Sequence, residues 1–163
     1  MQAPNEAAGA AQFAFSRSGS LVWAPSSATL NRLAWVNRRG TVELLPLRAT
    51  SRSSVYPRLS PDGERVAFID GTDLWVYDVR RGSTTRLTFT GNNTRPEWSP
   101  DGEGLVFSSN VIGTRNVYWI AADGSGAVVQ LTQSENATLP ESVSPDGRVL
   151  AYREQHPETR SDI

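Results

Sequence analysis

The chain carries one tetrapeptide, Ser-Pro-Asp-Gly (SPDG), three times, at residues 60–63, 99–102 and 144–147. A second series has a similar spacing: Gly40, Gly82 and Gly124 stand 42 residues apart, and each follows an aromatic residue by five positions. The two series alternate along the chain in the same order and with a similar spacing, which indicates a chain built from repeated units. A strand-rich repeat of roughly 40–45 residues is typical of β-propeller blades.

Each repeat is predicted to hold four antiparallel strands. In SPDG, proline presets the φ of the second turn position and glycine takes the positive φ of the fourth, which closes a tight hairpin. The strand before each SPDG contains a proline, which a ladder tolerates at an edge or bulge, so we expect it to be the innermost strand. Because 13 glycines and 10 prolines interrupt the chain, long helices have little room. The predicted fold class is therefore all-β, a partial β-propeller of four-stranded antiparallel blades.

The repeats also predict the domain organisation. We expect an N-terminal extension at residues 1–11 and a propeller fragment at residues 12–163, with blades at about 12–47, 55–89, 95–132 and, incomplete, 139–163. The first blade has only a decayed tetrapeptide, Ser16-Arg17-Ser18-Gly19. Closed propellers usually have roughly four to eight blades, so about three and a half blades are expected to stay open. Open blade edges favour self-association.

Composition excludes several classes of function. All 16 basic residues are arginine, there is no cysteine, and His156 is the single histidine. Schiff-base lysines, phosphate-binding lysines, thiol catalysis and most zinc sites are thereby excluded. The formal charge of −1 argues against nucleic acid as a partner, and no apolar stretch is long enough to span a membrane. We expect no catalytic residue, no metal and no cofactor.

Three candidate sites have simpler explanations. The SPDG aspartates (Asp62, Asp101 and Asp146) lie one per blade, so we interpret them as turn residues rather than as a metal or acid–base site. The arginine pairs at 38–39 and 80–81 would form a basic patch or, more simply, solvated turns. His156 has no serine or cysteine partner at motif spacing and is interpreted as a surface residue.

A partner is expected on the face opposite the SPDG turns. The loops that join one blade to the next (48–54, 90–94 and 133–138) share a face with the loops at 70–72 and 109–114, and these are the longer, more polar loops. Their amide and guanidinium groups have no evident structural role in the sequence, and arginine is enriched at binding hot spots. The partner-binding candidates, for a protein or a small ligand, are Arg52, Asn92, Asn93, Arg95, Asn110, Arg115 and Asn136.

The repeat resembles a known family. The pattern x-Pro-x-x-SPDG, a strand, Asp73-Leu74-Trp75-Val76 and then Leu-Thr is similar to the WD40-like propeller repeat of the TolB-type proteins. More narrowly, residues 33–40 followed by 56–63 resemble the propeller segment that follows the membrane span in bacterial eukaryotic-like serine/threonine protein kinases.

The resemblance implies a non-catalytic module for binding or sensing, on the periplasmic or outer side of the membrane, although no signal peptide is visible. Kinase activity does not carry over, because the chain has no lysine, no glycine-rich kinase loop and no His-Arg-Asp loop. The alternative is a propeller that serves an enzyme, either as the sensor region of such a kinase or as the gating propeller of a serine peptidase.

Overall fold

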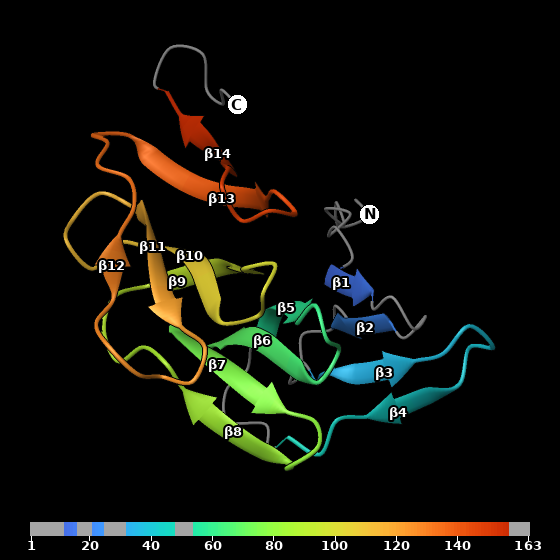
Figure 1. Cartoon of the computed structure of the whole chain (residues 1–163). Coiled ribbons are helices and arrows are strands. Elements are labelled where there is room, and N and C mark those ends of the chain that lie inside the picture. Colours follow the sequence, from blue (N-terminus) through green and yellow to red (C-terminus); the bar gives the residue numbers. More distant parts are fainter. Residues whose placement is uncertain (1–11, 16–20, 25–31, 48–53, 157–163) are drawn as a thin grey trace, which may run out of the picture.

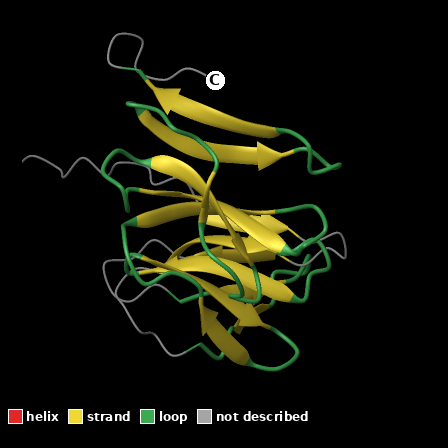
Figure 2. Cartoon of the chain, turned by 60° about the vertical axis from the view of Figure 1, so that its left-hand side comes forward, coloured by secondary structure: helices red, strands yellow, loops and turns green. Residues whose placement is uncertain are grey.

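The computed structural model describes residues 12–15, 21–24, 32–47 and 54–156. These residues form strands and turns, and no helix occurs among them (Figure 2). Residues 1–11, the decayed tetrapeptide and Arg52 lie outside the described residues.

The strands form four antiparallel sheets, in which neighbours in sequence are neighbours in space. The first blade comprises β1 (Gln12–Phe15), β2 (Leu21–Ala24), β3 (Ala34–Val36) and β4 (Val42–Leu44). The second comprises β5 (Ser54–Leu59), β6 (Arg65–Asp70), β7 (Asp73–Asp78) and β8 (Ser83–Arg86). The third comprises β9 (Asn93–Trp98), β10 (Gly104–Ser109), β11 (Asn116–Ala121) and β12 (Val129–Gln130). The fourth has two described strands, β13 (Ala137–Val143) and β14 (Leu150–Gln155).

The sheets follow one another around an arc, with the first strand of each sheet on the inside (Figure 1). Strand β5 contacts β1 and β2, β9 contacts β5, β6 and β7, and β13 contacts β9, β10 and β11. In the described part of the chain no strand of the fourth blade contacts the first. The predicted fold class, a partial propeller with four-stranded antiparallel blades, is confirmed.

The three SPDG turns have the predicted geometry. Gly63, Gly102 and Gly147 have φ angles of 77°, 74° and 73°, and the amide of each donates to the carbonyl of the serine three residues earlier. The serine hydroxyl donates to the aspartate carboxylate, at 2.5 Å in the second and third blades and 2.6 Å in the fourth. Each carboxylate also accepts a backbone N–H two residues further on, at 2.9–3.1 Å. The aspartates therefore hold turns, as interpreted from the sequence.

The prolines of the inner strands are fully buried where the ladders are irregular. Pro57, Pro96 and Pro140 are all less than 2 % exposed. The register between inner and second strand shifts near each of them, which is the signature of a β-bulge. The residues before two of them, Tyr56 and Arg95, have positive φ angles of 56° and 51°.

Apolar side chains fill the spaces between adjacent blades. One cluster joins the second blade to the third, with Leu74, Leu105 and Phe107 at most 1 % exposed. Another joins the first blade to the second through Leu33, Val66 and neighbouring side chains. Aromatic side chains such as that of Phe107 belong to these clusters, because large flat side chains bury the area that stacked sheets need to exclude from water.

The junction between the second and third blades also has polar contacts. The Arg65 guanidinium lies 4.9 Å from the centre of the Trp98 ring and donates to the Gly102 carbonyl at 2.8 Å. The Trp98 indole N–H donates to the Arg58 carbonyl at 2.9 Å. These contacts join β5 and β6 of the second blade to β9 and the SPDG turn of the third.

Candidate functional site

The loops at the end opposite the SPDG turns lie together in the structure. Hairpin geometry brings the β6–β7 loop and the start of the next blade to this end, and the Asn93 amide donates to the Thr72 carbonyl at 3.0 Å. The Asn92 amide donates to the side-chain oxygen of Asn110, in the β10–β11 loop, at 2.8 Å. We call this surface the loop face.

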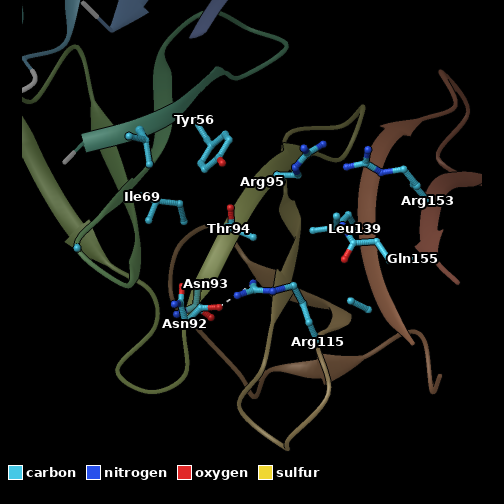
Figure 3. Close-up of a pocket in the computed structure, with 13 residues that line it drawn as sticks. Tyr56, Ile69, Asn92, Asn93, Thr94, Arg95, Arg115, Leu139, Arg153 and Gln155 are labelled. Atoms are coloured by element: carbon cyan, nitrogen blue, oxygen red, sulfur yellow. Dashed lines mark hydrogen bonds between the residues drawn. The ribbon is translucent and has the colours of Figure 1, made fainter. Parts of the chain in front are cut away.

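A pocket of about 450 Å³ opens where the loop face meets the inner strands. Its walls come from β5, β9 and β13, with further residues from β6, β14 and the loops before β9 and β11. Figure 3 shows Tyr56 on one side and Leu139 and Gln155 on the other, with Arg95 and Arg115 between them. The pocket therefore draws on the second, third and fourth blades.

The pocket is positively charged. Three of its thirteen lining residues, Arg95, Arg115 and Arg153, are arginines, and none is acidic. Two of the arginines pair with Glu141, whose Oε1 lies 2.9 Å from Nη1 of Arg95 and 3.5 Å from Nε of Arg153. One carboxylate thus serves two guanidinium groups, although the whole chain carries a formal charge of −1.

Arg115, the third arginine, is held by hydrogen bonds to backbone carbonyls. Its Nη1 donates to the Asn92 carbonyl at 2.9 Å (Figure 3) and to the Ser108 carbonyl at 3.4 Å. Among the described residues no carboxylate lies within salt-bridge distance of it. Burial lowers the pKa of the Arg115 guanidinium, an effect that nearby Tyr56 opposes, and the group remains charged at neutral pH.

Two lining residues have an unfavourable backbone conformation. Tyr56 and Arg95 occupy the left-handed region that favours glycine, each at the residue before a buried proline. A conformation of this kind costs about 1–3 kcal/mol and persists where the surrounding structure imposes it, often at binding sites. Both residues lie at bulges of neighbouring inner strands, and in this conformation both line the rim of the pocket.

The structure brings some of the expected partner-binding residues together. Four of them line the pocket: Asn92, Asn93, Arg95 and Arg115. Asn110 adjoins them through its bond to Asn92, whereas Asn136 donates to Glu154 at 2.8 Å. Arg52 lies outside the described residues.

One premise of the sequence interpretation was wrong. Asn93 was expected to present a free amide, but it is 2 % exposed and donates to the Thr72 carbonyl, the Thr88 hydroxyl and the Thr90 carbonyl at 2.6–3.1 Å. A buried amide needs such partners, so Asn93 supports the loops. Conversely, the sequence interpretation missed Tyr56, Arg153 and Gln155, because no motif marks them.

Other candidate features do not assemble into a site. Arg80 and Arg81 contact Glu64 and Asp78 at 3.2 and 3.8 Å, at the SPDG end of the second blade. In the described ranges no three His, Asp or Glu side chains gather as a metal would require. Within those same ranges no helix is long and apolar enough to cross a membrane.

The chain is similar to a known family and to individual known proteins. A family model described as the TolB beta propeller domain matches residues 6–162. A TolB homolog from Chlorobium chlorochromatii (strain CaD3) is 41% identical over 104 residues, which are 61% of this chain and 23% of that protein. An uncharacterized peptidase, YuxL, from Bacillus subtilis (strain 168) is 28% identical over 105 residues, which are 58% of this chain and 16% of that protein.

Among solved structures, a putative TolB from Agrobacterium tumefaciens has a TM-score of 0.78 at 23% identity, covering 90% of this chain and 55% of that one. This likeness concerns the fold. The chain spans less than two thirds of the length of each of these relatives.

Proposed function

The chain belongs to the TolB β-propeller family, and we propose that it is a non-catalytic module that binds a protein or ligand through its loop face. The observation that carries the proposal is the positively charged pocket on that face, which includes four of the residues selected from the sequence. Exposed loops on a rigid scaffold are where binding residues concentrate, and arginine is common at binding hot spots. The SPDG end, by contrast, uses its serine and aspartate side chains to hold turns.

A second candidate is a propeller that serves an enzyme. The likeness to a protein described as a peptidase supports a gating propeller. The resemblance to the propeller segments of bacterial serine/threonine kinases supports a sensor region, placed on the outer side of the membrane. Gene sequence on either side distinguishes these roles: a kinase domain with a membrane span upstream supports the sensor, and a Gly-x-Ser-x-Gly hydrolase domain downstream supports the gate.

The binding role is tested by comparing two faces of the molecule. The variant Arg95→Ala/Arg115→Ala removes two cations from the pocket, and the control Arg80→Ala/Arg81→Ala removes two from the SPDG end. We expect the pocket variant to lose capture of partners from extracts of the cells that make the protein, while the control retains it. Melting temperatures check that both variants are folded. Loss of capture in the control alone would place the binding face at the SPDG end and contradict the proposal.

A further inference from the structure

We propose that the pocket is a carboxylate-binding site, in which Arg115 holds the carboxylate of a free organic acid or of an acidic peptide. The inference rests on the proposed binding function and names the chemical class of the ligand. It is carried by the geometry of Arg115, by the charge of the lining and by the strained backbone at the rim.

Arg115 is fixed in place but keeps unused hydrogen-bonding capacity. A guanidinium has five N–H donors in a planar fork. Only Nη1 of Arg115 is engaged, with the carbonyls of Asn92 and Ser108, and among the described residues Nε and Nη2 have no hydrogen-bond partner. The backbone bonds orient the side chain, so a ligand need not. A carboxylate binding Nε and Nη2 would form the paired, charge-assisted arrangement that guanidinium groups favour.

The surrounding charges favour a singly charged group over a phosphate dianion. Arg95 and Arg153 both face the Glu141 carboxylate, so their charges are partly neutralised. Arg115 is left as the one lining arginine that has no carboxylate partner among the described residues. One unpaired guanidinium matches one carboxylate in charge, whereas a dianion would need a second free cation.

The size and rim of the pocket suit a ligand that carries such a group. A volume of about 450 Å³ falls within the roughly 300–1,000 Å³ of typical ligand sites. Leu139 and Ile69 supply apolar wall, and Gln155 supplies an exposed amide at the edge. The strained residues Tyr56 and Arg95 lie at the rim on adjacent inner strands, a placement that fits a preformed ligand clamp.

Titration calorimetry at low salt with two probes tests the proposal. Butyrate, a monocarboxylate, represents a free acid, and an acetyl-Gly-Glu-Gly amide represents an acidic peptide. Butyramide and the corresponding glutamine peptide are the uncharged controls, and inorganic phosphate is the competing anion. We expect at least one carboxylate probe to bind and its amide not to bind. Whichever of the two binds more tightly identifies the source of the carboxylate.

Three variants locate the binding. Arg115→Gln should lower the affinity for the carboxylate probe by about 10- to 100-fold, because a charge-assisted hydrogen-bonded pair is lost. Gln155→Glu keeps every contact of Arg115 but adds a negative charge at the exposed edge, so it should also weaken binding, and less so at high salt. Arg148→Gln removes an exposed arginine from the SPDG turn of the fourth blade and should leave the affinity unchanged.

Several outcomes would contradict the proposed carboxylate-binding site. The proposal fails if neither carboxylate probe binds, if the amides bind equally well, or if Arg115→Gln and Arg148→Gln have the same effect. Phosphate binding as tight as that of butyrate would also overturn it, since the site would then accept any anion. Carboxylate binding without capture of a protein would support this inference and disprove only the protein-binding form of the proposed function, and capture without carboxylate binding would disprove only this inference.

Discussion

Gly63 and Gly102 test the turn assignment at the scale of single residues. Their φ angles of 77° and 74° are unfavourable for any residue with a Cβ, and most of all for a β-branched one. Gly63→Val and Gly102→Val should each lower the free energy of unfolding by about 1–3 kcal/mol. Gly102→Asn is the matched control, because asparagine tolerates this conformation better and should cost less. Urea unfolding measures the differences. Equal losses for valine and asparagine at residue 102 would contradict a backbone cause.

The SPDG aspartates predict how stability depends on pH. The hydrogen bonds from the serine hydroxyls, and then those from backbone amides, hold the pKa of Asp101 and Asp146 below the ordinary value of 3.8. A carboxyl whose pKa is lowered by folding stabilises the fold above its unfolded pKa, and this contribution is lost as the pH falls through the folded value. We therefore expect stability to decline in acid.

The variant Asp101→Asn/Asp146→Asn should flatten part of this acid decline, because the amides do not titrate. Urea unfolding of the variant and the parent between pH 7 and about pH 3, a range that spans ordinary aspartate pKa values, makes the comparison. A variant profile parallel to that of the parent over the whole range would show that these two turns do not contribute to acid sensitivity.

The residues of the candidate site could be predicted only in part. The sequence places Asn92, Asn93, Arg95 and Arg115 on one face through loop order alone. It does not reveal that the Asn93 amide is buried, because its partners Thr88 and Thr90 meet Thr72 of the preceding loop only in the folded chain. Positive φ at Tyr56 is likewise invisible in a non-glycine residue and arises from its bulge beside a buried proline.

The ion pair between β5 and β9 makes a prediction at the scale of elements. Nε of Arg58 lies 2.6 Å from Oε1 of Glu97, and both side chains are mostly buried. Arg58→Met keeps the apolar stem but leaves a buried carboxylate unpaired, so we expect a loss of about 1–3 kcal/mol. The double variant Arg58→Met/Glu97→Gln should regain part of the lost stability. Arg80→Met breaks an exposed pair and should change stability by less than about 0.5 kcal/mol.

The cost of breaking the Arg58–Glu97 ion pair should depend on pH. Burial raises the pKa of Glu97, against the opposing effect of Arg58. A raised carboxyl pKa means that folding favours the protonated form, so the penalty in Arg58→Met should shrink as the pH falls through the folded pKa. Chemical denaturation at a series of pH values measures this. A penalty that stays constant down to acid pH would show that the Glu97 charge is not its source.

Strands were easier to predict than their contacts. Turn residues and apolar runs are local signals, so the order of strands and the innermost position of the proline strand follow from the sequence. The structure starts β9 and β13 two residues before the expected blades, because Asn93 and Thr138 bond to the preceding blade through backbone amides. The pocket itself depends on three strands from three blades, which no local pattern encodes.

The whole molecule is expected to self-associate when prepared as these 163 residues. In the described part of the chain β14 pairs with β13 alone, and apolar side chains nearby are exposed, with Val149 63 % and Tyr152 38 % exposed. Unpaired edges with apolar neighbours promote pairing between chains. Sedimentation at several concentrations should show larger species that Val149→Lys/Tyr152→Lys reduces. Ile112→Lys, at a loop residue that is 72 % exposed, should not reduce them. A monomer at all concentrations would contradict the expectation.

The junction made by Arg65 has a consequence for how such a molecule is assembled from copies. Arg65 reaches from the second blade to the Gly102 carbonyl and the Trp98 ring of the third. The corresponding residue of the third blade is Gly104, where the Trp119 indole leaves no space for a Cβ, and that of the fourth is Val149. Blades that share one backbone plan are therefore not interchangeable. A gene in which the blades were exchanged could keep every SPDG tetrapeptide and every strand. It could nevertheless place glycine or valine where the neighbouring blade requires arginine. The differences between the repeats therefore determine the order in which the blades can stand.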